Sequence, residues 1–237
     1  MAFERRFVRE LPFGICIGIS LPTIAGDRQR RDDEPFGLPA GLHADEVKFA
    51  LGLSPPRRAG WVGGRVALRA ALAALGFDAP APILASTRGA PLLAPGAVGS
   101  VSHKSDLAVA LVARAAAAPG ATLGIDVEVV RSFRHDIAGH VLTPDERAAL
   151  PPDGPARDAE VLRLFSAKEA IYKALDPWVQ RFVSFQEASV TRADPPDAGL
   201  VARLVLAQSE GPFAVELHDV SDADFILVAA RIAPRAE

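Results

Sequence analysis

Apolar and small residues alternate near the start of the chain. From Phe13 to Ser20 a large apolar side chain takes every second position, and a period of two is typical of a β-strand. Pro12 and Pro22 bracket this run, and Glu4 and Glu10 interrupt the basic residues before it. We therefore predict a strand rather than a secretion signal. Since no segment approaches the ~18 uninterrupted apolar residues of a membrane-spanning helix, we expect no membrane association.

The pattern changes to a helical period further along the chain. It predicts a short helix over residues 45–51 and a longer one that begins at Pro55 and ends at Gly76. Ser54 is the expected N-cap, because serine followed by proline at the first helical position is a typical helix start and glycine a typical stop.

The longer helix is predicted to carry a basic face. At 100° per residue, Arg58, Arg65 and Arg69 fall within about 40° of one another. The same helix holds Gly60, Gly63 and Gly64. Glycine in a helix interior costs about 1 kcal/mol, so these glycines are either tolerated or allow another group to approach the backbone.

Short apolar runs predict further strands and a division into halves. The runs span residues 98–102, 107–113, 123–130 and 225–232. A linker of small residues over 115–121 places the expected boundary between residues 1–118 and 119–237. The runs that start after Asp106 and Asp224 both end in Ala-Arg, which suggests two related α/β halves rather than a doubly wound sheet.

The predicted strand 123–130 carries two carboxylates. Its odd positions are apolar and are expected to face a core, whereas Gly124, Asp126 and Glu128 share the opposite face. Residues two apart on a strand are separated by about 6.5 Å, and neighbouring carboxylates repel unless a cation or a proton lies between them. The spacing suits Mg²⁺, but an exposed strand face with two charges would look the same.

An amphipathic helix is predicted over residues 160–175, with Pro177 as its stop. Lys168 falls in the centre of the apolar stripe, where a lysine needs an anion or must extend past its neighbours to solvent. Glu169 and Lys173 lie one turn apart at the edge of the stripe, which is also the spacing of an ordinary surface ion pair. Two of the chain's four lysines are in this helix.

Composition and charge narrow the class of protein. The chain has 237 residues, of which 49% are hydrophobic and 23% charged, so it is globular, with one large or two small domains. The net charge of −3 conceals residues 57–114, which hold seven basic and two acidic side chains, net +5. One basic stretch in an otherwise acidic chain suits a small anionic ligand better than nucleic acid. The single cysteine, Cys16, favours a reducing compartment and excludes a multi-cysteine zinc site.

Two motifs together resemble the 4′-phosphopantetheinyl transferases of the enterobactin-synthase and surfactin type. They are Leu123-Gly-Ile-Asp-Val-Glu128 and, about forty residues later, Leu164-Phe-Ser-Ala-Lys-Glu-Ala-Ile-Tyr-Lys-Ala-Leu175. Other matching segments lie at residues 56–72, 88–91, 99–103 and 182–188. The resemblance therefore covers most of the chain between about residues 40 and 190.

The resemblance implies an α+β fold of two similar halves in a pseudo-twofold arrangement, with the active site in the cleft between them. It implies transfer of the 4′-phosphopantetheine group from coenzyme A to a serine of an apo acyl or peptidyl carrier protein, with release of adenosine 3′,5′-bisphosphate. Mg²⁺ is the expected metal, with Mn²⁺ as an alternative. We expect a cytoplasmic monomer that binds neither nucleic acid nor membrane.

The resemblance also assigns roles by position. Asp126, Glu128 and Glu169 would hold the metal, and Glu169 would accept the serine proton directly or through a metal-bound water. Lys168 would neutralise charge at the transferring phosphate, and Lys173 would contact a pyrophosphate oxygen or support the site. The residues expected to bind coenzyme A are Arg57, Arg65, Arg88, Ser102, His103, Lys168 and Tyr172.

Two alternatives stay open at this point. The helical wheel favours Arg58 over Arg57 as the partner of Arg65, so either arginine is a candidate for the 3′-phosphate. A catalytically inactive protein that binds coenzyme A or a nucleotide would need the arginines but not the carboxylates. A nucleic-acid binder is disfavoured by the acidic majority of the chain and by an aromatic content of 6%.

Overall fold

The protein consists of two compact units, unit 1 (Met1–Ala117) and unit 2 (Ala118–Glu237). Each unit has its own antiparallel sheet and its own hydrophobic core. The computed structural model describes residues 3–22, 37–117, 119–130, 136–194 and 199–235. Most of the Gly26–Pro39 segment, which is rich in Asp, Arg, Gly and Pro and is therefore predicted to be a loop, lies outside these ranges. None of the helices within them is long and apolar enough to cross a membrane.

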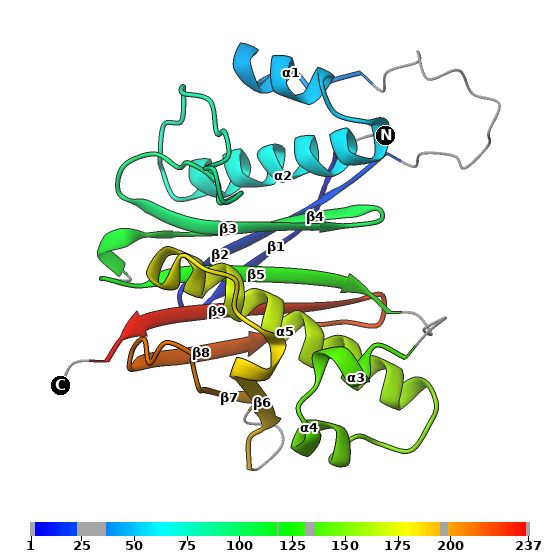
Figure 1. Cartoon of the computed structure of the whole chain (residues 1–237). Helices are drawn as coiled ribbons and strands as arrows, with labels where there is room; N and C mark the ends of the chain where they lie inside the picture. Colours follow the sequence, from blue (N-terminus) through cyan, green and yellow to red (C-terminus); the bar gives the residue numbers. More distant parts are fainter. Residues whose placement is uncertain (1–2, 23–36, 118, 131–135, 195–198, 236–237) are drawn as a thin grey trace. The chain divides into compact units, whose positions relative to one another are not determined.

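Unit 1 is a four-stranded antiparallel sheet with the strand order β1-β2-β4-β3. The strands are β1 (Arg5–Leu11), β2 (Gly14–Ser20), β3 (Ala97–Lys104) and β4 (Leu107–Arg114). The helices are α1 (Ala44–Leu51), α2 (Pro55–Ala74) and the 3₁₀ turn η1 (Ala115–Ala117). Helix α2 lies along one face of the sheet (Figure 1). The predicted strands and both predicted helices of this unit are confirmed.

The glycines of α2 allow this helix to lie close to the sheet. A Cβ atom on Gly63 would lie 2.1 Å from Leu21 Cδ2, and one on Gly64 would lie 2.8 Å from Val101 Cγ2. A side chain at either position would meet its neighbour unless Leu21 or Val101 moved, so the glycines allow a close approach to α2.

Unit 2 has a three-stranded antiparallel sheet, with the order β5-β9-β8, and a separate two-stranded ribbon, β6-β7. The strands are β5 (Thr122–Val129), β6 (Ala188–Arg192), β7 (Leu200–Leu204), β8 (Phe213–Asp219) and β9 (Phe225–Pro234). The helices are α3 (Ala138–Val141), α4 (Pro144–Ala148), α5 (Pro155–Val179) and the 3₁₀ turn η2 (Phe185–Glu187). Helix α5 crosses one face of the β5-β9-β8 sheet (Figure 1).

Helix α5 is longer than the sequence predicts at both ends, and Pro177 lies inside it rather than stopping it. A proline this close to the end of a helix removes a single backbone hydrogen bond, which the last turn tolerates. The helix ends instead at Gln180, which has a left-handed φ of 49° and whose N–H donates to Asp176 O.

Candidate active site

Strand β5 and helix α5 make direct backbone contact at Gly124. A Cβ atom at this position would lie 1.8 Å from Ala170 O, so only glycine allows the helix to pack here. The face of β5 that carries Gly124, Asp126 and Glu128 is therefore turned toward α5. The prediction that this face lies away from a core is wrong. Asp126 is 5% exposed and Glu128 6% exposed, and the strand is buried on both faces.

Two side chains of α5 bind β5 on either side of Glu169. Ser166 Oγ donates to Asp126 O at 3.1 Å. Lys173 Nζ donates to Ile125 O at 2.9 Å and to Asp126 Oδ1 at 2.8 Å. Residues 166, 169 and 173 lie on one face of an α-helix, so the half-buried Glu169 shares the face that is turned toward β5. Of the predicted site residues, Asp126 and Lys173 are thus in direct contact, and Glu169 lies on the same face of α5 as Lys173.

The three carboxylates do not form a ready-made metal centre. Within the described ranges, no three His, Cys, Asp or Glu side chains are grouped so that they could hold a metal ion. The Lys173 ammonium, paired with Asp126 Oδ1, places a cation on the buried carboxylate. The region around Asp126 therefore already accommodates positive charge, which is the property a metal site would need.

Lys168 is buried in the apolar stripe, as the sequence predicts, but its anionic partner differs from the expected one. Its side chain is completely buried, and its ammonium donates to Val141 O at 2.9 Å, to Phe185 O at 2.9 Å and to the carboxylate of Glu146 at 2.7 Å. These three bonds use all three ammonium hydrogens. The anion that a buried lysine requires is therefore Glu146 and not a substrate phosphate, so Lys168 is removed from the predicted phosphate-binding residues.

Tyr172 lies one turn after Lys168 and is held by its hydroxyl. Tyr172 Oη donates to Ser184 O at 3.1 Å, and its ring packs against that of Phe185 with 5.3 Å between centroids. Burial, and to a lesser degree the negative charge of Glu169, raises the pKa of Tyr172 well above its usual value. The phenol therefore remains protonated at neutral pH.

The predicted basic face of α2 is only partly a binding surface. Arg58 caps the C-terminus of α1 by donating to three carbonyl groups, those of Ala50, Leu51 and Leu53. Arg69 forms an ion pair with the buried Glu46, with 2.9 Å between Nη2 and Oε1. The helical wheel correctly predicted that Arg58 and Arg69 share one face of α2, but both side chains bind groups within unit 1.

Arg65 is also largely buried, at 4% exposure. Its Nε donates to Ile83 O at 2.8 Å, and its guanidinium lies over the ring of Trp61, with Cζ 4.2 Å from the centroid. Burial lowers the pKa of Arg65 to about 10, so it stays positively charged at neutral pH. Arg57, by contrast, is exposed.

His103 packs against the backbone of α2. A Cβ atom on Gly60 would lie 2.5 Å from His103 Nδ1, so the missing side chain makes room for the imidazole. Gly60 is one helical turn after Arg57. Arg57 and His103, which are both predicted to bind coenzyme A, therefore lie at the same end of α2. Ser102 is buried in β3, and Arg88 is exposed in the loop before that strand.

Most of this chain is similar in sequence to known proteins. Residues 49–113 match the 4′-phosphopantetheinyl transferase N-terminal domain, and residues 122–226 match the 4′-phosphopantetheinyl transferase superfamily. The 4′-phosphopantetheinyl transferase Svp of Streptomyces mobaraensis is 37% identical over 194 residues, which is 80% of this chain and 76% of Svp. The chain belongs to the 4′-phosphopantetheinyl transferase superfamily.

A second relative supports the same assignment. The 4′-phosphopantetheinyl transferase PptT of Mycobacterium tuberculosis is 36% identical over 160 residues, 67% of this chain and 69% of PptT. Among solved structures, the Chronobacterium ammoniagenes ACPS-CoA complex covers 49% of this chain and 98% of that chain, with 18% identity and a TM-score of 0.40. The α+β fold and the transferase activity expected from the sequence are confirmed, which disfavours the alternative of an inactive binding protein.

Two buried carboxylates of this phosphopantetheinyl transferase escaped the sequence analysis. Glu46 is fully buried and Glu146 is 3% exposed. Each closes a capping box at the start of its helix, with His43 as the N-cap of α1 and Thr143 as that of α4. The Thr-x-x-Glu spacing is a recognisable helix-start signal, but it gives no indication that the glutamate is buried against a distant lysine.

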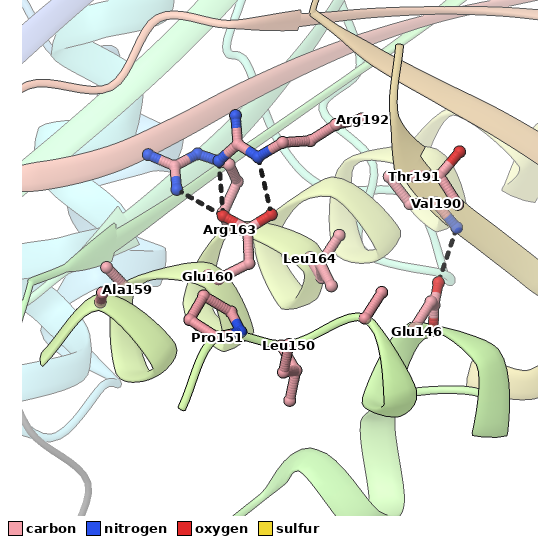
Figure 2. A pocket seen from close by; sticks show the side chains of 12 residues that line it. Glu146, Leu150, Pro151, Ala159, Glu160, Arg163, Leu164, Val190, Thr191 and Arg192 are labelled. Carbon is pink, nitrogen blue, oxygen red and sulfur yellow. Dashed lines mark hydrogen bonds and ion pairs between the residues drawn. The ribbon is translucent and has the colours of Figure 1, made fainter. Parts of the chain in front are cut away.

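The transferase also has a pocket of about 690 Å³ beside Glu146 (Figure 2). It is lined by Glu146, Ala149, Leu150, Pro151, Ala156, Ala159, Glu160, Arg163, Leu164, Val190, Thr191 and Arg192. Glu160 pairs with both Arg163 and Arg192, as the dashed lines in Figure 2 show. None of the predicted site residues lines this pocket, which is therefore distinct from the region where Lys173 of α5 contacts Asp126 of β5.

Proposed function

We propose that this enzyme transfers the 4′-phosphopantetheine group of coenzyme A to a serine of an apo acyl or peptidyl carrier protein, with Mg²⁺ as cofactor. Family membership supports the reaction class. The observation that carries the proposal is the attachment of α5 to β5 by Ser166 and Lys173. This attachment turns Glu169 toward the strand that carries Asp126 and Glu128.

Asp126, Glu128 and Glu169 are the residues that would hold Mg²⁺. Carboxylate oxygens are the ligands that Mg²⁺ prefers, and the cation of Lys173 against Asp126 supports the fit of a positive charge. When bound, Mg²⁺ supplies positive charge to the pyrophosphate oxygens of coenzyme A.

Glu169 is proposed to accept the proton of the carrier serine. The serine oxygen then bonds to the phosphorus of phosphopantetheine, while the bond from that phosphorus to the adenosine 3′,5′-bisphosphate oxygen breaks. Phosphoryl transfer of this kind depends mainly on positioning and on electrostatic stabilisation, so the site needs no nucleophilic side chain of its own. Lys173 keeps one ammonium hydrogen beyond its two bonds to β5, and we assign this hydrogen to a pyrophosphate oxygen.

The residues of unit 1 are proposed to bind the adenosine end of coenzyme A. Arg57 is assigned to the 3′-phosphate in preference to Arg58, because the Arg58 guanidinium is engaged by the carbonyls of α1. The remaining residues assigned to this end are Arg65, Arg88, Ser102 and His103. On unit 2, Tyr172 is assigned to the pantetheine side of the site.

Mass spectrometry of apo carrier proteins tests this proposal. Carriers from fatty acid, polyketide and nonribosomal peptide synthesis are incubated with the enzyme, coenzyme A and Mg²⁺. We expect at least one carrier to gain the mass of one phosphopantetheine group. The gain should disappear with Glu169→Gln and with EDTA, and it should return when Mg²⁺ is added back to the wild-type reaction.

Glu216→Gln is the matched control, because Glu216 is a half-exposed carboxylate on β8 that pairs with Arg231. It should modify the carrier at the wild-type rate. The assignment is wrong if no carrier of any of the three types gains mass. If a carrier is modified equally well by Glu169→Gln, the reaction stands but Glu169 is not its base.

A further inference from the structure

The Glu146 carboxylate is a junction between separate parts of unit 2. Its Oε2 accepts from Thr143 N at 2.6 Å and from Lys168 Nζ at 2.7 Å, and its Oε1 accepts from Val190 N at 2.6 Å. Figure 2 shows the bond to Val190 at the wall of the pocket. One side chain thus joins the start of α4, the middle of α5 and strand β6.

Lys168 extends this junction to two further segments. Its other two hydrogen bonds go to Val141 O at the end of α3 and to Phe185 O in η2. Five segments of unit 2 therefore meet at one buried ion pair: α3, α4, α5, η2 and β6. Because both charges are out of contact with water, neither can be satisfied by solvent if the other moves away.

This junction fixes the axial position and the rotation of α5. A shift by one residue moves each side chain by 1.5 Å along the helix axis and 100° around it, which would break all three bonds of Lys168. Glu169 is the next residue. It is held between the Lys168 junction and the bonds that Ser166 and Lys173 make to β5.

We propose that Glu146 is a positioning residue for phosphopantetheine transfer: through Lys168 it holds α5 so that the face that carries Glu169 is turned toward the strand of Asp126. This inference rests on the role of Glu169 proposed above. Misplacement of a reacting group by about 1 Å can cost 10²-fold in rate, so loss of this junction should reduce the rate of the chemical step without weakening binding.

Unit 1 offers a matched control. Glu46 accepts from the N-cap N–H of its helix, from a basic side chain and from a distant backbone N–H, just as Glu146 does. Its basic partner is Arg69, and the next residue is Ala70. Replacing Glu46 therefore removes an equivalent buried junction that has no carboxylate beside it.

The test compares Glu146→Gln with Glu46→Gln in steady-state transfer to an apo carrier. All rates are measured at a temperature at which circular dichroism shows each variant to be fully folded. Glu146→Gln should lower kcat ten- to a hundredfold and leave KM for coenzyme A within twofold of wild type. Glu46→Gln should leave kcat within twofold. Equal kcat values for these two variants would overturn the inference.

A second pair of variants separates positioning from folding. Lys168→Met leaves the Glu146 charge buried and alone, whereas Glu146→Gln with Lys168→Met leaves no buried charge and should melt at a higher temperature. If the junction positions Glu169, kcat stays equally low in both. If kcat recovers together with the melting temperature, the junction is only structural and the inference is wrong. Full activity of Glu169→Gln would instead refute the proposed role of Glu169 on which the inference rests.

Discussion

Glu46 and Glu146 make equivalent contacts in the two units of the protein. Each accepts hydrogen bonds from the N-cap of a short helix, from a basic residue on the long helix that follows, and from a backbone N–H beyond that helix. The donors are His43, Arg69 and Ile83 for Glu46, and Thr143, Lys168 and Val190 for Glu146. This shared arrangement is stronger evidence that the two units are related in architecture than the similarity of two apolar strands.

Replacing Gly124 by alanine should separate α5 from β5. The new Cβ would lie 1.8 Å from Ala170 O, and this atom is backbone, so neither partner can turn aside. We expect a loss of at least about 2 kcal/mol in the free energy of unfolding, measured in urea, together with loss of transfer activity. Gly139→Ala is the control, because nothing lies within 4 Å of its Cβ position. A wild-type midpoint for Gly124→Ala would contradict the contact.

Alanine variants of the adjacent arginines should have opposite effects. Arg58→Ala removes the cap of α1 and should cost about 1–2 kcal/mol of stability, with KM for coenzyme A unchanged. Arg57→Ala should leave the urea midpoint unchanged and raise KM for coenzyme A about tenfold, the cost of one charged contact. The reverse pattern would assign the 3′-phosphate to Arg58.

Removal of the Lys173 charge should make the protein depend on Mg²⁺ for stability. Asp126 is buried, with 5% of its surface exposed. Lys173→Met removes the ion pair of its carboxylate and should lower the free energy of unfolding by about 1.5–3 kcal/mol. Mg²⁺ should then raise the melting temperature of the variant more than that of the wild type, because the metal replaces the lost cation. Equal shifts in the two proteins would argue against a metal at Asp126.

Acid stability should depend on the ion pair between Arg181 and Glu187. Hydrogen bonding from Arg181 lowers the pKa of Glu187 to about 2, from 4.5 in the unfolded chain. A carboxylate with a lowered pKa stabilises the fold fully above pH 4.5, and this contribution is lost as the pH falls toward 2. The melting temperature of wild type should therefore exceed that of Arg181→Met by a constant amount above pH 5, and the difference should shrink between pH 4.5 and 2. A difference that does not change with pH would exclude this cause.

The sequence was sufficient to predict the strand and the helix that hold the candidate site residues. It did not predict which face of the strand packs against the helix. The strand at β5 and the helix at α5 followed from periodicity. Gly124, Asp126 and Glu128 look like an exposed polar face because small and charged residues alternate with apolar ones. Only the contact with the Ala170 backbone shows that this is the face that receives the helix.

The missed residues share a physical cause. Glu146 is 22 positions before Lys168, and Glu46 is 23 positions before Arg69. Neither pair has a helical or strand spacing, so no local pattern joins them. The same limit explains Arg58, whose position on the helical wheel is correct but whose acceptors are carbonyls of another helix.

The burial of the single cysteine has a practical consequence. Cys16 lies within β2 with no exposed surface, and burial raises the pKa of its thiol to about 12. Only the thiolate reacts readily with maleimides and disulfides, so the native enzyme should be inert to such reagents. A cysteine introduced on α5 could therefore carry a fluorescent probe in an otherwise wild-type chain, and the helix could be followed during turnover without first replacing Cys16.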